Sequence, residues 1–211
     1  MLSKKLTPAE SSNHSNIINM KTYFNFRKKL YGGVWEIKSD MPYSILSDGP
    51  FDEANLKLLD LPFRICHGKK QRDIIYRYED ISIEFLSQNI YSFLSRYGDV
   101  RPYLYPIHIE GVDDVYYFVH DLPEFEFINR DASLGLNTTE EEVSCFLLQD
   151  DMPPFFTMDN TRCKIITPEM KAAMIKEKLT NISFEPVYGV SSMEEYYELQ
   201  RNDQLRYPTK P

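Results

Sequence analysis

The sequence lacks the common signatures of catalysis and of membrane insertion. It contains no phosphate-binding loop, no G-x-G-x-x-G fingerprint and no H-E-x-x-H pair. Its acids show no calcium-loop spacing, and adjacent surface acids do not supply the two separated carboxylates of a glycosidase. No stretch approaches the roughly 20 apolar residues that span a bilayer. We therefore predict no catalytic, metal-binding or cofactor-binding residues and no association with a membrane.

Cysteine and histidine are also scarce. The three cysteines, Cys66, Cys145 and Cys163, form no C-x-x-C pair and have apolar neighbours, which predicts buried reduced thiols. Two lysines near the N-terminus are followed by no apolar run of signal-peptide length, so we expect a cytoplasmic protein. His108 and His120 fall on opposite faces of a predicted hairpin, where they cannot share a metal ion.

Charge is present in excess of one sign, and it is unevenly distributed. The 211 residues carry a net charge of −8. Residues 110–160 contain 13 acids and one basic residue, Arg130, so this segment carries −12 and the other 160 residues +4. Direct binding of nucleic acid is not expected, because phosphate binding needs a cationic surface. The acidic segment is either solvated surface or a docking surface for a cationic partner.

The apolar pattern predicts an α+β fold, with a mixed or antiparallel sheet and two main amphipathic helices packed on it. The first helix is predicted to begin after Ser82 and to stop at Gly98, and the second to begin at Thr167-Pro168-Glu169 and to stop near Asn181. A hairpin with a loop at 111–114 is predicted to place residue 110 opposite residue 115. Strands are predicted at 34–37, 61–66, 74–78, 103–109, 115–120, 125–128, 143–148, 155–158, 164–166 and 182–187.

The two helical regions resemble each other. Matching Ser82 to Thr167 gives an offset of 85 residues, and matching Pro106 to Pro186 gives an offset of 80. The likeness indicates either a degenerate duplication of a strand-helix-strand unit or the small number of ways to cap a helix. Each proline is predicted to lie at a sheet edge or a bulge, because it cannot donate to the ladder.

The chain is predicted to contain one domain. Residues 1–20 are expected to be disordered, residues 21–189 to form a single α+β domain or two packed halves near 21–111 and 112–189, and residues 190–211 to form a short helix and a flexible tail.

The second half of the sequence also carries a familiar series of motifs. These are Ser82-x-Glu84-Phe85, Tyr105-Pro106-Ile107, Tyr116-Tyr117, Phe127-Ile128-Asn129-Arg130-Asp131-Ala132-Ser133, Phe146-Leu147-Leu148, Ile165-Ile166-Thr167-Pro168-Glu169 and Leu179-Thr180-Asn181-Ile182-Ser183-Phe184-Glu185-Pro186-Val187. Over roughly residues 60–189 the pattern resembles polymorphic-toxin immunity family eleven, whose α+β members are encoded beside secreted bacterial toxins. The resemblance implies a cytosolic, stoichiometric inhibitor that occludes one cognate toxin and has no catalytic residue.

A docking surface follows from the acids together with this resemblance. Many antibacterial toxins have cationic active sites, so an acidic inhibitor can imitate the anionic substrate. Aromatic anchors usually supply the strongest contacts. The predicted toxin-binding residues are Asp113, Asp114, Tyr116, Tyr117, Asp150, Asp151, Phe155 and Phe156. For the aromatic residues the alternative is packing in the core.

Two other functions remain open from the sequence. One is a small enzyme that reverses a toxin's modification, which would require His120 and nearby acids to line a pocket. The other is an adaptor or chaperone that holds a secreted effector before export.

Overall fold

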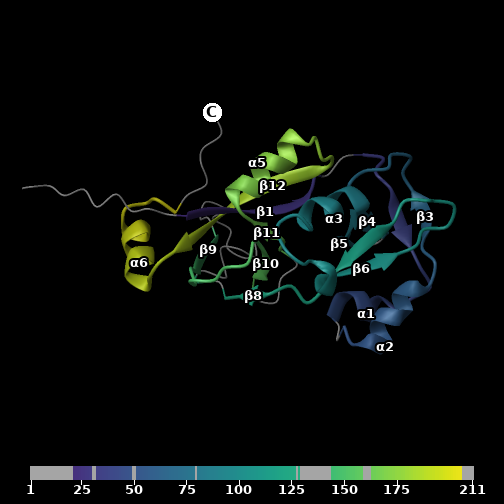
Figure 1. Ribbon diagram of the computed structural model, residues 1–211, viewed down its shortest axis with the longest axis horizontal. Coiled ribbons are helices and arrows are strands. Elements are labelled where there is room, and N and C mark those ends of the chain that lie inside the picture. Colours follow the sequence, from purple (N-terminus) through teal and green to yellow (C-terminus); the bar gives the residue numbers. More distant parts are fainter. Residues whose placement is uncertain are drawn as a thin grey trace, which may run out of the picture.

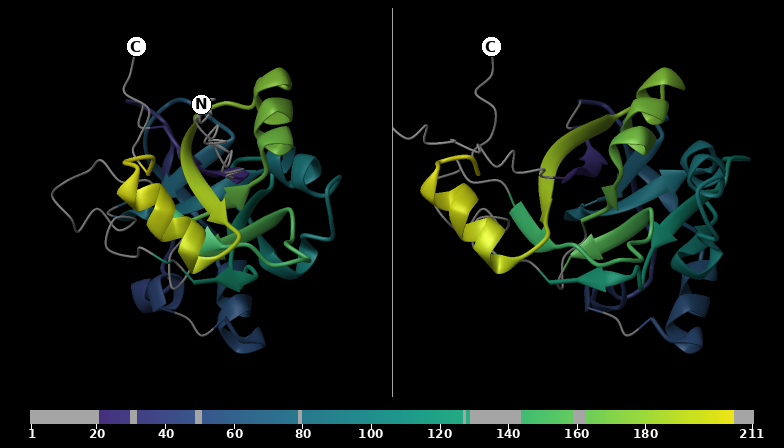
Figure 2. Two further views of the ribbon diagram at one scale, coloured as in Figure 1. Left: turned by 90° about the vertical axis from the view of Figure 1, so that its left-hand side faces the viewer. Right: turned by 60° about the vertical axis from the view of Figure 1, so that its left-hand side comes forward.

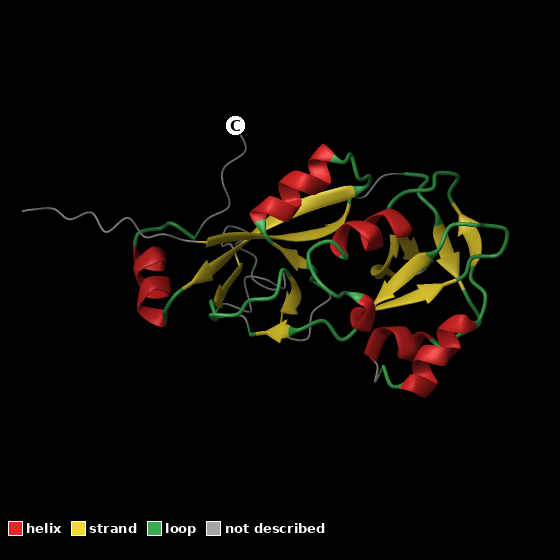
Figure 3. Cartoon of the chain, viewed as in Figure 1, coloured by secondary structure: helices red, strands yellow, loops and turns green. Residues whose placement is uncertain are grey.

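The computed structural model describes residues 21–29, 32–48, 51–78, 80–126, 128, 144–158 and 163–205 (Figures 1 and 3). Within these ranges it contains five α-helices and two six-stranded sheets. This mixed content confirms the predicted α+β class. In the described part of the chain no helix has both the length and the apolar composition needed to cross a bilayer. The predictions for residues 1–20 and for the end of the tail lie outside the described residues.

One sheet, here called the β5 sheet, lies on the right of Figure 1. Its strands, in spatial order, are β3 (Arg64–His67), β2 (Glu36–Lys38), β4 (Ile74–Arg77), β5 (Asp80–Ser87), β7 (Tyr116–Val119) and β6 (Leu104–Ile107). One face packs against α1 (Tyr43–Asp48), α2 (Glu53–Lys57) and η1 (Leu58–Asp60), in a core that includes Leu46, Leu59 and Phe85. Helix α3 (Gln88–Leu94) covers the other face, and η2 (Arg101–Tyr103) precedes β6.

The second sheet, here called the β1 sheet, lies on the left of Figure 1. Its strands, in spatial order, are β8 (Glu124–Phe125), β10 (Phe155–Met158), β11 (Ile165–Ile166), β1 (Lys21–Lys28), β12 (Ile182–Val190) and β9 (Ser144–Leu147). Helix α5 (Pro168–Lys176) packs against it, and α6 (Met193–Arg201) packs beyond the end of β12. The rings of Phe125 and Phe146, on the two edge strands, lie 5.0 and 5.5 Å from the ring of Phe156. The sheet is therefore curved enough to bring both edge strands to the ring of Phe156. The bend of strand β12 is visible in Figure 2.

Five strands and one helix repeat the same arrangement in both sheets. The α3 unit has the strand order β2-β4-β5-β7-β6, with α3 between β5 and β6 along the chain; the α5 unit has the order β8-β10-β11-β1-β12, with α5 between β11 and β12. In each unit the first two strands are parallel and the remaining neighbours are antiparallel. The equivalent of β7, which follows β6, is β1 from the start of the chain. The α5 unit is thus circularly permuted relative to the α3 unit, and the division of the units does not follow the predicted boundary near residue 111.

The repeat also holds in register. Phe118 of β7 faces Phe85 on one side and Tyr105 on the other. In the α5 unit Asn25 of β1 faces Ile165 and Glu185, each 80 residues after its counterpart. The prolines of β6 and β12 keep the same offset. The predicted likeness is therefore structural, but it aligns Ser87, not Ser82, with Thr167.

The position of the first helix differs from the prediction. Residue 82 lies inside β5, and α3 begins only after Ser87, whose hydroxyl accepts a hydrogen bond from the N–H of Ile90. The strand extends this far because β4 and β7 pair with it on both sides, and Ile83 and Phe85 alternate into the same core. The second helix begins as predicted, with Thr167 as its N-cap, but it ends at Lys176.

The hairpin of β6 and β7 forms, but its register is shifted by two residues. Tyr105 faces Phe118 instead of His120. The connection is longer than predicted because Phe63 holds it through two backbone bonds, from its N–H to His108 and to its carbonyl from Glu110. Strand β6 is an edge strand, as predicted from its proline.

The proline of β12 lies in an inner strand. Pro186 faces Phe24 of β1 on one side. On its other side, among the described residues, the pairing with β9 begins at Val187. The predicted edge position is wrong for Pro186, because β12 is flanked by β1 and β9.

The two units pack face to face through a shared core. This core contains both members of four equivalent pairs: Ile74 and Phe155, Leu86 and Ile166, Ile90 and Met170, Leu94 and Met174. All eight are at most 4% exposed. The burial of these side chains is the main apolar contribution that holds the units together.

Candidate functional site: a polar cleft across α3

A cleft of about 800 Å3 lies along α3 where three other segments meet the helix. These segments are residues 71–73 before β4, the β6–β7 connection at Asp114, and residues 177–180 between α5 and β12. Its size matches that of ligand sites, roughly 300–1,000 Å3, but those are mostly apolar. This cleft is lined mainly by polar and charged side chains.

The floor of the cleft is a closed hydrogen-bond network around the buried Asp73. One carboxylate oxygen accepts from the Ser87 hydroxyl (2.7 Å) and the Asn89 amide (3.0 Å). The other accepts from the N–H (2.6 Å) and hydroxyl (2.8 Å) of Thr180. Burial by itself raises the pKa of Asp73, but these donors outweigh it and hold the pKa below its ordinary value. Asp73 is therefore ionised, and it ties α3 to the α5–β12 connection.

Two further contacts fix the ends of the cleft. The buried Tyr116 donates its hydroxyl to the carbonyl of Arg72 (2.8 Å), and burial raises its pKa to about 12. At the other end Arg96 makes a two-point contact with Glu177, at 2.7 and 2.8 Å. The cleft is thus braced by both units.

The exposed face of α3 is flanked by a second hollow of about 480 Å3, lined by Tyr91, Ser92, Ser95, Gly98, Asp99 and Arg101. Ser92 lines both hollows. Beside them the rings of Tyr91 and Tyr117 stack with their centres 4.4 Å apart. Both rings are partly exposed. The helix therefore has a hollow on each side of Ser92 and a stacked aromatic pair beside them.

Charges of both signs surround the cleft. Asp114 accepts a hydrogen bond from the Gln71 amide (2.6 Å), and Asp113 beside it is exposed. Arg72 and Lys178 lie on other walls. Among the described residues, none of Asp113, Arg72 and Lys178 forms an ion pair.

The corresponding segment of the α5 unit has different chemistry. Matching β4 to β10 places Asp150, Asp151, Met152, Pro153 and Pro154 at the positions of Lys69, Lys70, Gln71, Arg72 and Asp73. A Cβ placed on Gly98 would lie 3.8 Å from the Pro154 Cγ. Where Asp73 makes polar bonds to the other unit, Pro154 therefore lies close to Gly98 and has no polar side-chain atom to offer.

The eight predicted docking residues do not form one surface. Tyr116, Phe155 and Phe156 are at most 4% exposed and pack in the cores, so these three rings are not available as surface anchors. The remaining five lie at the surface: Asp113, Asp114 and Tyr117 in the α3 unit, and Asp150 and Asp151 between β9 and β10. The β6–β7 connection and strand β9 lie at opposite ends of the molecule (Figure 1).

The acidic segment nevertheless faces solvent. Eight of its acids fall within the described residues and all are exposed: Glu110, Asp113, Asp114, Asp121, Glu124, Glu126, Asp150 and Asp151. Apart from Glu124, these acids form no ion pair with Lys or Arg among the described residues. Acids elsewhere do form such pairs: Asp40, Glu53, Glu84, Asp99, Glu177 and Glu185.

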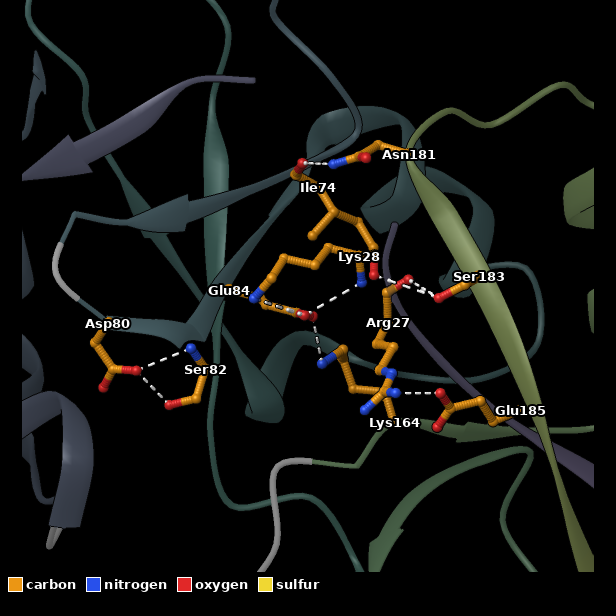
Figure 4. Close-up of polar contacts among 10 residues, drawn as sticks. All are labelled: Arg27, Lys28, Ile74, Asp80, Ser82, Glu84, Lys164, Asn181, Ser183 and Glu185. Carbon is orange, nitrogen blue, oxygen red and sulfur yellow. Dashed lines mark hydrogen bonds and ion pairs between the residues drawn. The ribbon is translucent and has the colours of Figure 1, made fainter. Parts of the chain in front are cut away.

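A buried ionic cluster joins the two units behind the cleft. Glu84 of β5 lies between two lysines of the α5 unit (Figure 4). Its carboxylate is 2.7 Å from the Lys164 ammonium and 3.7 Å from that of Lys28. All three side chains are at most 8% exposed.

Burial and charge act in opposite directions within this cluster. Burial by itself raises the pKa of Glu84, but the two lysines outweigh it, so the pKa lies below its ordinary value. Burial lowers the pKa of Lys28, partly offset by Glu84. At the 80-residue offset Glu84 and Lys164 are equivalent positions, so opposite charges meet where the units face each other.

Of the described residues, His67, His108, His120 and the three cysteines do not line the cleft. His120 packs against the ring of Phe51 and contacts Asp121 at 3.1 Å, and His120 does not line the cleft. No group of three or more His, Cys, Asp or Glu among the described residues could hold a metal ion. Cys66, Cys145 and Cys163 form no disulfide with one another, but only Cys145 is fully buried.

Asp73, Ser92 and Thr180 were not identified as site residues from the sequence. Each is a common residue without a motif, and the network forms only when segments 107 positions apart meet. One signal was available: aligning the helix caps at Ser87 and Thr167 pairs Glu84 with Lys164, an acid with a base.

Comparison of the sequence with known protein families finds no family that matches. Comparison with curated protein sequences gives no significant match.

Proposed function

We propose that this chain is an immunity protein, a stoichiometric inhibitor that binds one secreted bacterial toxin and blocks it by occlusion. The observation that carries the proposal is the acidic surface. Seven of its exposed acids form no ion pair with Lys or Arg among the described residues: Glu110, Asp113, Asp114, Asp121, Glu126, Asp150 and Asp151. Such a surface steers a cationic partner toward the protein and favours binding to a basic active-site face.

The chemistry of the cleft supports binding over catalysis. A general base needs a lone pair that can reach a substrate proton. Both oxygens of Asp73 instead accept two hydrogen bonds each from the protein itself. The alternative enzyme would require His120 to line a pocket with nearby acids, whereas the described cleft does not include His120.

Co-expression tests the proposal directly. The protein encoded by the gene immediately upstream is expressed with and without this chain, and a toxin of another system is the control. We expect growth to be restored only for the upstream toxin, and a complex of one copy of each protein in size-exclusion chromatography with light scattering. Protection without a complex, or protection by substoichiometric protein, would contradict occlusion and favour the enzyme.

The salt dependence of binding tests the electrostatic part. Exposed charges interact over a Debye length of about 10 Å at 0.1 M salt and about 3 Å at 1 M. We therefore expect the association rate, measured by stopped-flow fluorescence, to fall as salt is raised. A rate independent of salt would exclude the acids as steering groups.

A further inference from the structure

The two units share one frame, but their surfaces are not interchangeable. Position 92 on α3 corresponds to position 172 on α5, and both are exposed. Ser92 lines both hollows, which are here together called the groove, and the larger hollow has mainly polar walls. The equivalent segment of the α5 unit carries Met152, Pro153 and Pro154 at the positions of the polar Gln71, Arg72 and Asp73. The polar wall that residues 71–73 give the groove is thus a feature of the α3 unit.

We infer that the groove across α3 is the docking surface for the toxin, and that its occupant is a polar loop of the toxin that carries a lysine or arginine. This inference rests on the proposed immunity function. The cationic side chain of the loop would meet Asp113 and Asp114, which lie together in the β6–β7 connection. Carbonyl or carboxylate oxygens of the loop would meet Arg72 and Lys178, which have no ion-pair partner among the described residues.

The groove is preorganised for such a loop. Asp73 and the Arg96–Glu177 pair hold its walls in place before any partner arrives. A rigid surface loses little conformational entropy when it binds, which favours affinity. The stacked Tyr91 and Tyr117 add a partly exposed aromatic edge of the kind that supplies strong contacts in interfaces.

The first test compares one large substitution at two equivalent positions. Ser92→Arg fills the middle of the groove, and Ala172→Arg places the same side chain at the matching position of α5. Arginine is a good helix former, so both variants should fold, which circular dichroism and thermal melting would verify. With the upstream toxin we expect Ser92→Arg to raise the Kd at least about 100-fold and Ala172→Arg to change it less than about threefold.

The second test compares the two acidic pairs. Replacing Asp113 and Asp114 by Lys should slow association roughly tenfold at low salt and weaken its salt dependence. Replacing Asp150 and Asp151 by Lys makes the same change of charge outside the groove and should leave most of the rate intact.

The outcomes separate the docking surface from the function. Equal effects of Ser92→Arg and Ala172→Arg on the Kd, or a Kd within twofold of wild type for Ser92→Arg, would show that the groove is not the docking surface. The protein would still bind the toxin, so the proposed function would stand. If replacing Asp150 and Asp151 slows association more than replacing Asp113 and Asp114, the cationic side chain of the toxin binds at the β9–β10 connection. That result would overturn the proposed occupant of the groove. If the wild-type chain forms no complex and gives no protection, the immunity function fails and the groove proposal fails with it.

Discussion

The α3 and α5 units use the same frame and differ most where they meet and at their surfaces. The shared core keeps equivalent apolar residues, such as Ile90 with Met170 and Leu94 with Met174. At the junction Glu84 faces its own equivalent, Lys164. Two identical charged residues there would repel each other in a buried place, whereas opposite charges attract. Because the two units carry opposite charges at this equivalent position, they form an ion pair that two identical units could not form.

The largest expected effect comes from breaking this pair asymmetrically. Glu84→Gln leaves two buried ammonium groups without a carboxylate and should lower the free energy of unfolding by about 3–5 kcal/mol. Lys164→Met should cost less, because Glu84 keeps Lys28 as a partner. Urea denaturation at neutral pH measures both. Equal losses in the two variants would mean that Lys28 takes no part in the cluster.

The next effect concerns acid. The pKa values of Asp73 and Glu84 lie below their ordinary values in the folded protein, so their stabilisation is complete above the unfolded values near 4 and is lost as the pH falls through the folded values. We expect the free energy of unfolding to fall below about pH 4. Asp73→Asn should cost about 1–3 kcal/mol at pH 7 and flatten this dependence. The equivalent change, Pro154→Ala, should leave the slope with pH unaltered.

The helix caps give a smaller and closely matched comparison. Thr167→Ala should destabilise the protein by about 1 kcal/mol through the loss of the cap on α5. Ser87→Ala should cost more, about 2 kcal/mol, because Ser87 caps α3 and also donates to Asp73. Thermal melting of both variants measures the difference. If Thr167→Ala were the more destabilising change, the Asp73 network would contribute little.

The smallest effect is expected at the flank of the helices. Tyr91 stacks on Tyr117, and at the equivalent position the Lys171 ammonium lies 3.5 Å from the centre of the Phe24 ring. Because both arrangements place a side chain over an aromatic ring, Tyr91→Lys should change stability by less than about 1 kcal/mol. Chemical denaturation measures the change in stability. A loss larger than this would mean that the stacked ring and the cation over a ring are not interchangeable at this position.

Local signals in the sequence were sufficient where the partner of a group lies only a few residues away in the chain. The cap at Thr167 forms with the N–H of Met170, three residues away, and this helix start was predicted correctly. The boundary between β5 and α3 was not, because pairing with β4 and β7 decides it. The hairpin register was also wrong, since Phe63, 45 residues from His108, fixes the connection.

The site was harder to predict than the fold. Asp114 lines the cleft and Asp113 beside it is exposed, but Tyr116, also predicted to be a docking residue, is buried in the core. Alternation along β7 sends Tyr116 into the core and leaves Tyr117 partly exposed, and the local sequence did not indicate which of these two faces would be covered. The burial of Glu84 depends on lysines from the other unit, so no local pattern could have indicated it.

Strand β1 has a consequence for how the chain assembles during synthesis. All strands of the β5 sheet lie between residues 36 and 119, so the ribosome delivers them together and this sheet can form early. Strand β1 is made before any of them, yet its neighbours are β11 and β12, the last two strands of the chain. Because contacts so distant in sequence form slowly, the first strand to leave the ribosome is among the last to find its place.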